Sequence, residues 1–346
     1  MFRALRVSKE TNAPASVALE VVSDDDLMPG DVTVDVEYSS INFKDGLALA
    51  GKPGVIRQYP LIPGIDFVGT VVGSDSDAWT IGDRVILNGW GVGETHHGGL
   101  AERARVPGEW LVPLPDGLSP KQAAAIGTAG FTAMLAVLAL ERSGALYGSF
   151  AAAYAGTNPD GEAPQSPAEV LVTGAAGGVG SIAIALLSSL GHRVTASTGR
   201  LAEEPYLRSL GATTIVDRAE FSEPGKPLQR QRWAGAVDSV GGRTLANVLA
   251  QTTYGGTVAS CGLAQSADLP ATVMPFILRA VTLTGINSVQ APMVLRTEAW
   301  RRMASDLDLG LLEEITSSVT LAEAPALAHR ILAGQVRGRT VVDVRA

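Results

Sequence analysis

Residues 169–198 read EVLVTGAAGGVGSIAIALLSSLGHRVTAST, and this stretch decides the fold of the region around it. A β-branched apolar run leads into a glycine-rich turn, an apolar helix-forming run follows, and a second β-branched run begins after Gly191. The pattern predicts strand, turn, helix and strand in succession, which is the repeating unit of a parallel sheet. Alternating units continue to about residue 289, so we predict an α/β domain with a doubly wound parallel sheet.

The turn between the first strand and the helix has the spacing Gly174-x-x-Gly177-x-x-Gly180. Glycines allow a tight turn and a close approach of the backbone to a pyrophosphate, and the helix N-terminus offers unpaired N–H groups. The position of the triplet between strand and helix therefore predicts a dinucleotide-binding site. A tight turn needed only for packing is the alternative.

The end of the second strand indicates which dinucleotide is bound. NAD-binding units place an acidic residue there for the ribose 2′-hydroxyl, whereas this chain reads Ala196-Ser197-Thr198-Gly199-Arg200. Hydroxyls and a guanidinium suit a 2′-phosphate, so the sequence favours NADPH over NADH. An ordinary surface role for Arg200 is the alternative.

The 346 residues predict two domains, because single domains usually have 100–200 residues. Residues 1–125 carry short β-branched runs separated by turn residues, which predicts a barrel-like β domain. Val32, Val34 and Val36 alternate with charged positions, which predicts a strand with one face toward solvent. A buried helical region begins near Ser119, and the Gly- and Pro-rich stretch 147–168 predicts an exposed insertion.

Composition narrows the function classes. The net charge of −8 and the isoelectric point of about 5.1 argue against general nucleic-acid binding. No run of about 20 uninterrupted apolar residues is present, and the N-terminus lacks the apolar core of a secretory signal. One cysteine, Cys261, excludes an internal disulfide. We therefore expect a cytoplasmic protein without membrane spans.

The sequence predicts no metal site. Residues 1–125 have no cysteine, and their only histidines are the neighbours His96 and His97, which would point to opposite sides of a strand. Oxidation of an alcohol would then lack its usual Lewis acid. Hydride addition to a C=C bond activated by an adjacent carbonyl needs only positioning and hydrogen-bond donors, so this chemistry is favoured.

Several motifs resemble the zinc-free quinone-oxidoreductase branch of the medium-chain dehydrogenases/reductases. They are SSINFKD (39–45), IPGID (62–66), GTAGFTA (127–133) and the glycine turn at 173–180. Three more, GWGVGE (89–94), WAGA (233–236) and VMPFILR (273–279), are similar to the NADPH-dependent acryloyl-CoA reductase family. The resemblance covers essentially the whole chain except the 147–168 stretch.

The resemblance implies a GroES-like β-barrel catalytic domain at residues 1–125, completed by 290–346, and a Rossmann NADPH-binding domain at 126–289. It implies NADPH-dependent reduction of acryloyl-CoA to propionyl-CoA, with NADPH and the substrate meeting between the domains. Hydride would add to Cβ of the acyl group, and protonation at Cα would follow. An apolar edge strand near 281–285 would pair with a second copy, giving a homodimer.

By the same resemblance, a set of residues is implied to bind the cofactor through its pyrophosphate, its 2′-phosphate and its nicotinamide. The set is Phe43, Ala176, Gly177, Gly178, Val179, Thr198, Gly199, Arg200, Arg218, Leu263, Ile277 and Ser288. Phe43 stands where relatives often have tyrosine, so it can pack against the nicotinamide but cannot supply a hydroxyl proton.

For the catalytic and substrate candidates, the sequence allows either a functional or a structural role. Asn42, Phe43 and Asp45 are the catalytic candidates, although an Asx turn with a helix cap would also explain Asn42 and Asp45. Arg57, Trp90, His96 and Arg339 are the substrate candidates; His97 shares with His96 the role of candidate proton donor. We expect Lys44 to pair with Asp66, and contact with a CoA phosphate is the alternative.

Two other functions stay open. The first is a zinc-free NADPH quinone or enone oxidoreductase on the same scaffold. The second is a non-catalytic dinucleotide-binding protein, because a fold does not determine a function.

Overall fold

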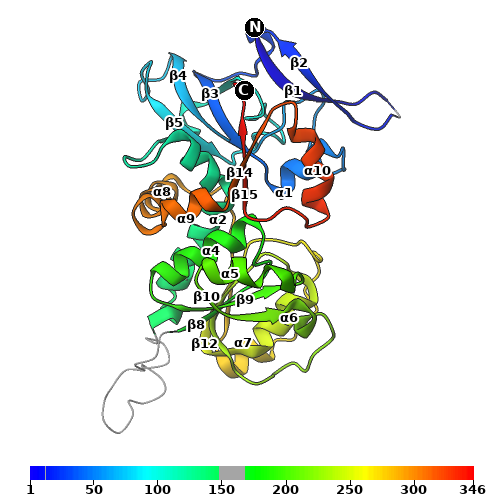
Figure 1. Ribbon diagram of the computed structural model, residues 1–346, viewed down its shortest axis with the longest axis vertical. Helices are drawn as coiled ribbons and strands as arrows, with labels where there is room; N and C mark the ends of the chain where they lie inside the picture. Colours follow the sequence, from blue (N-terminus) through cyan, green and yellow to red (C-terminus); the bar gives the residue numbers. More distant parts are fainter. Residues whose placement is uncertain (12, 148–167) are drawn as a thin grey trace. The chain divides into compact units, whose positions relative to one another are not determined.

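The computed structural model describes residues 1–11, 13–147 and 168–346 (Figure 1). The chain forms two compact units. Unit 1 comprises residues 1–131, 288–304 and 309–346, and unit 2 comprises residues 132–287 and 305–308. The predicted insertion at 147–168 lies outside the described residues except at its two ends.

Unit 1 is built on a seven-stranded sheet. The strand order is β14-β15-β3-β4-β5-β7, and β6 also pairs with β3. Val32, Val34 and Val36 of β3 are fully buried, so the alternation in this segment places one face of the strand on the core, as predicted. The bounds are β3 Val32–Ser40, β4 Asp66–Ser74, β5 Arg84–Asn88, β6 Arg103–Val106, β7 Val112–Pro113, β14 Thr316–Thr320 and β15 Arg339–Asp343.

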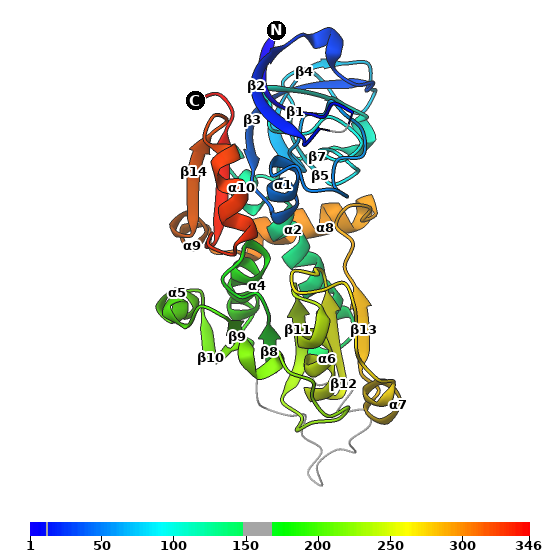
Figure 2. The same cartoon turned by 90° about the vertical axis from the view of Figure 1, so that its right-hand side faces the viewer.

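The remaining elements of unit 1 cover this sheet and extend it. Strands β1 (Phe2–Ser8) and β2 (Ser16–Val22) form an antiparallel hairpin. Helices α1 (Phe43–Leu49) and α10 (Ala324–Leu332) lie side by side (Figure 2), and a Cβ on Gly46 would collide with the Ile331 side chain. The other helices are α8 (Met293–Asp306), most of which belongs to this unit, α9 (Leu309–Glu314), and the 3₁₀ turns η1 (Asp24–Asp26) and η2 (Gly108–Trp110).

Unit 2 holds a six-stranded parallel sheet in the order β10-β9-β8-β11-β12-β13. The strand order runs in opposite directions on the two sides of β8, which confirms the doubly wound prediction and puts the topological switch point there. The strands are β8 Glu169–Val172, β9 Arg193–Thr198, β10 Ala212–Asp217, β11 Trp233–Asp238, β12 Thr252–Ser260 and β13 Thr282–Gly285. The helices are α4 Gly178–Ser189, α5 Glu204–Ser209, α6 Gly242–Gln251 and α7 Met274–Arg279, with 3₁₀ turns η3 Ala145–Tyr147, η4 Leu201–Glu203 and η5 Arg218–Phe221.

Helix α2 (Pro120–Arg142) passes from unit 1 into unit 2. It begins as predicted, because the Ser119 hydroxyl accepts from the Gln122 N–H and the Gln122 side chain accepts from the Ser119 N–H. Gly127, with φ of 48° and ψ of −157°, breaks the helix into two segments. Its apolar length would suit a membrane span, but 94% of its most apolar window is buried inside the protein, as in a core helix.

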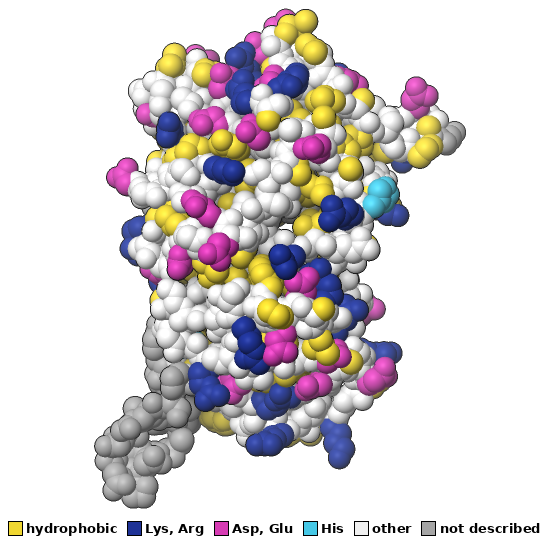
Figure 3. All heavy atoms as spheres, in the orientation of Figure 1, with side chains coloured by type: hydrophobic (Ala, Val, Ile, Leu, Met, Phe, Trp, Pro, Cys, Tyr) yellow, Lys and Arg dark blue, Asp and Glu magenta, His cyan; other side chains and the backbone are white. Residues whose placement is uncertain are grey.

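The surface carries both charge signs. On the face shown in Figure 3, Lys and Arg side chains gather over unit 2 with Asp and Glu between them. This mixture fits the modest net charge of −8.

Candidate functional site

The glycine turn of unit 2 lies between β8 and α4, at the carboxyl edge of the sheet. Gly174 has φ of 60°, and a Cβ on Gly180 would come within 2.5 Å of the Gly174 carbonyl oxygen. The first helical hydrogen bond runs from the Ser181 N–H to the Gly177 carbonyl. The N–H groups of residues 178–180 therefore have no carbonyl partner within the helix. This is the geometry that holds a pyrophosphate.

A second feature lies at the next strand end. Thr198 and Asp217 are paired in the β9–β10 register, so Gly199 and Arg218 follow at the same edge. A Cβ on Gly199 would lie 2.7 Å from both Cδ and Cζ of Arg218, so the arginine side chain crosses directly over the glycine. Arg200 lies beside them and forms a 3.6 Å ion pair with Glu203. Two guanidinium groups at one strand end fit a phosphate dianion.

Asp238 is a buried carboxylate next to the glycine turn, and it was not identified from the sequence. Asp238, at the end of β11, accepts hydrogen bonds from the Thr173 hydroxyl (2.7 Å) and the Gly241 N–H (2.8 Å). Burial raises the pKa of Asp238. Thr173 directly precedes Gly174, so Asp238 fixes the start of the turn. The VDSVGG segment at 237–242 was visible in the sequence, but its link to Thr173 depends on strand pairing.

Unit 1 contains a buried polar network centred on Asp66, the first residue of β4. Its carboxylate accepts from the Ser40 hydroxyl (2.8 Å), the Asn42 amide (2.8 Å) and the Thr128 N–H (2.8 Å). The Thr128 N–H can reach it because Gly127 breaks the helix there, and a Cβ on Gly127 would come within 3.1 Å of the Asp66 carboxylate. The network joins the end of β3, the start of α1 and helix α2.

Asp45 and Arg339 complete this network. Asp45 has no exposed surface and accepts from the backbone N–H groups of Asn42 (2.9 Å) and Ile65 (3.0 Å). Burial, followed by the nearby charge of Asp66, raises the pKa of Asp45 to about 7. The Arg339 side chain is also buried, and its guanidinium donates to the Ala125 carbonyl, the Asn42 side-chain oxygen and the Ser40 hydroxyl. Burial lowers the pKa of Arg339, while the neighbouring carboxylates oppose that shift.

This geometry favours a positioning role for Asn42, Asp45 and Arg339. Asn42 is only 8% exposed, and its amide is committed to Ser40, Asp45 and Asp66. The capping alternative for Asn42 and Asp45 therefore has direct geometric support. All three Arg339 contacts are internal, so its guanidinium has no surface on which to meet a substrate phosphate.

A more exposed group of residues lies near the start of α1. Phe43 is 44% exposed. Lys44 forms a 2.9 Å ion pair with Glu94, so the expected pairing of Lys44 with Asp66 is wrong: Asp66 is buried and its oxygens are taken by Ser40, Asn42 and Thr128. The Arg57 N–H donates to the Glu94 carbonyl, and its side chain is exposed. The Lys44 ammonium and the Arg57 backbone thus both contact Glu94, and the exposed Phe43 directly precedes Lys44 in the chain.

The two histidines are built into the fold. His96 is 8% exposed, with Nε2 3.1 Å from the Pro29 carbonyl and Nδ1 3.2 Å from the His97 carbonyl. His97 Nδ1 accepts from the Ile62 N–H. Burial, together with the neighbouring His96, lowers the pKa of His97 to about 4. His97 is therefore neutral at physiological pH, which makes it unsuitable as a proton donor.

The remaining cofactor candidates are accessible. Leu263 and Ile277 are 64% and 71% exposed, unusual values for large apolar side chains. Ser288 is half-buried and lies where the chain enters unit 1 after unit 2. Within the described residues, no group of three His, Cys, Asp or Glu side chains could hold a metal ion.

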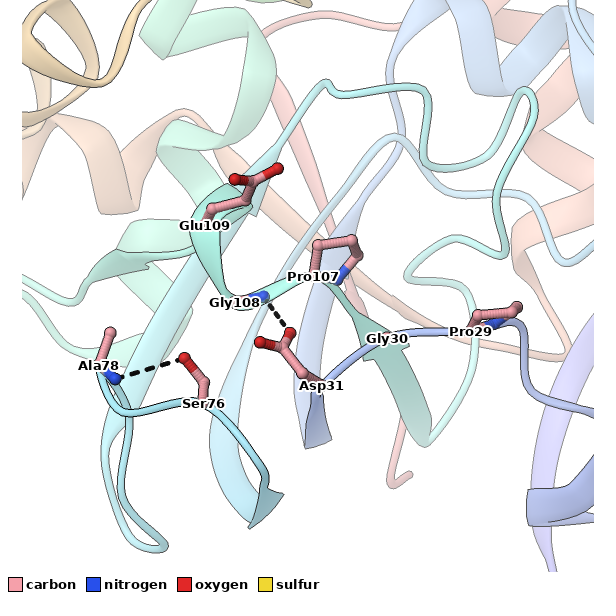
Figure 4. A pocket seen from close by; sticks show the side chains of 8 residues that line it. All are labelled: Pro29, Gly30, Asp31, Ser76, Ala78, Pro107, Gly108 and Glu109. Atoms are coloured by element: carbon pink, nitrogen blue, oxygen red, sulfur yellow. Dashed lines mark hydrogen bonds between the residues drawn. The ribbon is translucent and has the colours of Figure 1, made fainter.

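A pocket of about 470 Å³ lies elsewhere on unit 1 (Figure 4). Asp31 and Glu109 supply its charged groups, and the Asp31 carboxylate accepts from the Gly108 N–H. Its lining residues are Pro29, Gly30, Asp31, Ser76, Ala78, Pro107, Gly108 and Glu109, none of them basic. The pocket therefore does not suit an anionic ligand.

Comparison with known proteins identifies the family. Residues 28–116 match the alcohol dehydrogenase GroES-like domain, and residues 178–306 match the zinc-binding dehydrogenase domain. The chain is 51% identical to acrylyl-CoA reductase AcuI of Ruegeria pomeroyi, over 100% of both chains. The chain belongs to the medium-chain dehydrogenase/reductase family. It falls in the quinone-oxidoreductase branch, beside the acrylyl-CoA reductases.

Solved structures of other members of this family have the same fold. The Salmonella enterica yhdH oxidoreductase in complex with NADP has a TM-score of 0.90 and 49% identity, with 99% of each chain covered. Bacillus subtilis yhfP with NAD bound has a TM-score of 0.88 and 43% identity, with the same coverage. These neighbours confirm the GroES-like and Rossmann architecture.

Proposed function

We propose that this protein is an NADPH-dependent reductase that converts acryloyl-CoA to propionyl-CoA. The observation that carries the proposal is the full-length identity of 51% with a named acrylyl-CoA reductase, supported by the 50% identity with a probable one from Escherichia coli. The glycine turn and the paired arginines of unit 2 suit the cofactor that this reaction needs.

The residues present fit NADPH. The turn at 174–180 is tight, because a Cβ on Gly174 or Gly180 would collide with neighbouring protein atoms, and Arg218 crosses Gly199 where a 2′-phosphate would lie. When bound, NADPH supplies the hydride that adds to Cβ of the acyl group. Thr198, Gly199, Arg200 and Arg218 would hold the 2′-phosphate. Residues 176–179 would hold the pyrophosphate through the free N–H groups of Gly178 and Val179, since the Gly177 N–H already donates to the Gly174 carbonyl.

The chain's own residues would bind and orient the reactants. Phe43, Leu263, Ile277 and Ser288 are proposed to flank the nicotinamide half, since the first three expose apolar surface. Arg57 and Lys44 are proposed to attract the phosphates of the CoA ester, although Lys44 shares its charge with Glu94. Asn42, Asp45 and Arg339 would hold the start of α1, and with it Phe43, in place.

Reduction of quinones is a second candidate function. The chain is 44% identical over 99% of its length to a putative quinone oxidoreductase, YhfP of Bacillus subtilis. A quinone lacks a CoA group, so a quinone reductase would not depend on the basic residues near Glu94.

The test is the oxidation of NADPH, followed by absorbance, with acryloyl-CoA, free acrylate and a simple quinone. The proposal expects fast turnover of acryloyl-CoA and slow turnover of acrylate, because the CoA group supplies binding energy. Equal or faster turnover of the quinone would contradict the proposal and favour the second function.

We further propose a cytoplasmic homodimer. Strand β13 lies at the edge of the six-stranded sheet, and an unpaired edge invites pairing with a second copy. Val273, directly before α7, and Leu278, within α7, are 65% and 55% exposed, so apolar surface precedes this strand in the chain. Analytical ultracentrifugation should give the mass of a dimer, and a monomer at micromolar concentration would refute this part.

A further inference from the structure

Arg296 of helix α8 is a buried cation whose charge the proposed function does not use. It is 1% exposed and has no carboxylate partner among the described residues. Burial lowers the pKa of Arg296 to about 10, so it still carries its charge at neutral pH. Burying an unpaired charge lowers the stability of the fold unless neighbouring polar groups compensate for the lost hydration. The groups around the Arg296 guanidinium therefore have to supply that compensation.

The guanidinium is held by backbone carbonyls from two segments. It donates to the carbonyl of Asn88 (2.6 Å), which ends β5. It also donates to the carbonyls of Ser288 (3.1 Å), Val289 (2.9 Å) and Ala291 (2.9 Å). Every donor nitrogen of the planar fork is thus engaged, and the two segments are joined through one side chain.

The same two segments also meet directly. The Trp90 N–H donates to the Val289 carbonyl (2.9 Å). Gly89 has φ of 75°, and a Cβ there would lie 2.9 Å or less from the Ser288 carbonyl oxygen and the Val289 backbone. Gly89 is therefore required for the close approach of the two segments. Arg296 links the same segments through its hydrogen bonds to the Asn88, Ser288 and Val289 carbonyls.

The Arg296 guanidinium also contacts two aromatic rings. Its Cζ lies 4.6 Å from the ring centre of Trp90 and 5.2 Å from that of Phe131. Trp90 stacks on Trp110 with ring centres 6.4 Å apart, and Phe131 stacks on Trp300 at 6.5 Å. Cation–π attraction offsets part of the cost of burying the charge.

Trp90 has two features that the fold alone does not require. Its φ of 54° is strained for a residue with a side chain, and such strain concentrates at functional sites. Its indole N–H is buried and has no acceptor among the described residues. The Arg296 contacts hold this strained residue beside Val289. The neighbouring Ser288 is the residue that we have proposed for the nicotinamide half of the cofactor.

We propose that Arg296 is a positioning residue for the reduction, which fixes the Trp90 turn and the Ser288 backbone in one geometry. The inference rests on the proposed function, which gives Ser288 to the cofactor, and on the sequence-based prediction that Trp90 contacts the substrate. Arg296 itself would touch neither reactant. Its removal would allow the two segments to separate, and misplacement of reacting groups by about 1 Å can cost about a hundredfold in rate.

The test compares Arg296→Met, Arg296→Lys and the control Leu321→Ala. Leu321 is a buried core residue that follows β14, which is separated from β5 by β15, β3 and β4 in the sheet. Its truncation is expected to lower stability, while its side chain forms none of the hydrogen bonds or ring contacts that Arg296 makes with Asn88 and Trp90. For each protein, kcat and KM for acryloyl-CoA, KM for NADPH and the thermal midpoint are measured well below the unfolding range.

The inference expects kcat of Arg296→Met to fall at least about tenfold below that of Leu321→Ala at a similar thermal midpoint. KM for NADPH should change little, because the phosphate contacts lie in unit 2. Arg296→Lys should be intermediate, since it keeps the charge but loses the planar fork. Equal kcat values for Arg296→Met and Leu321→Ala would overturn the inference. If Arg296→Met does not fold, kcat of Arg296→Lys is compared with that of Leu321→Ala, and equal values would again overturn the inference.

The two proposals fail in different ways. If the unmodified protein does not reduce acryloyl-CoA but reduces a quinone, the proposed function is wrong, and the Arg296 variants are then compared on the quinone. A tenfold loss of kcat there would still support the positioning role, and unchanged kcat would refute it.

Discussion

Replacing Arg218 by alanine tests how the cofactor is chosen. Arg218 is exposed, crosses Gly199 and has no ion-pair partner within the described part of the chain. Its guanidinium is therefore available to a 2′-phosphate. A hydrogen bond to a charged group contributes about 1.5–3 kcal/mol, which corresponds to a change in affinity of about 10-fold to 150-fold. Exposure to solvent places the expected loss for NADPH near the lower limit.

The matched comparisons come from the same unit. Arg200→Ala should cost less than Arg218→Ala, because Arg200 already shares its charge with Glu203. Arg208→Ala, which removes an arginine paired with Glu204 on α5, should leave cofactor binding unchanged. NADH lacks the 2′-phosphate, so its KM should be the same in all four proteins.

The assay measures KM for NADPH and for NADH with acryloyl-CoA saturating, at low and high salt. The loss for NADPH in Arg218→Ala should shrink as salt screens the contact. If Arg218→Ala raised KM equally for both cofactors, or left KM for NADPH unchanged, the assignment of the 2′-phosphate to this strand end would be refuted.

Asp45, Gly180 and Cys261 each give a further prediction. First, the pKa of Asp45 is raised from its ordinary 3.8 to about 7 in the folded protein, so its contribution to stability is full below about pH 4 and is lost as the pH rises through 7. Between about pH 4 and 7, the free energy of unfolding measured in urea should therefore fall more steeply in the unmodified protein than in Asp45→Asn. The difference in slope should reach about 1.4 kcal/mol per pH unit, and parallel pH profiles of the two proteins would contradict this. Second, Gly180→Ala should abolish cofactor binding in a fluorescence titration, because its Cβ would lie 2.5 Å from the Gly174 carbonyl oxygen; normal binding would mean that the turn is not the cradle. Third, burial raises the pKa of the Cys261 thiol to about 12, so an alkylating reagent at pH 8 should leave activity intact, and rapid stoichiometric inactivation would show a reactive thiolate.

The sequence predicted the features whose causes are local. The glycine turn could be recognised because the backbone conformation at Gly174 and the close contact at Gly180 each demand glycine. Strand β3 followed from the alternation of buried valines with polar residues. In both cases the constraint lies within a few residues, where the spacing of residue types records it.

Other features depend on partners far away in the chain. Arg339 is 297 residues from Asn42, and no sequence pattern shows that the two side chains meet. Arg296 is 208 residues from Asn88, and its partners are carbonyl groups, which every residue has. The pairing of Lys44 was mispredicted because the buried Asp66 carboxylate already accepts four hydrogen bonds, from the Ser40 N–H and hydroxyl, the Asn42 amide and the Thr128 N–H. The Thr128 N–H becomes available only through the break at Gly127.

The central claim is that hydride reaches Cβ of an acyl-CoA and a proton reaches Cα. The most direct measurement is mass spectrometry and NMR of the product formed from acryloyl-CoA with NADPH that carries deuterium at the transferred position of nicotinamide C4. We expect propionyl-CoA with one deuterium at Cβ, and, with ordinary NADPH in heavy water, one deuterium at Cα. Consumption of NADPH without deuterated propionyl-CoA, or deuterium found at the wrong carbon, would contradict the proposed reaction.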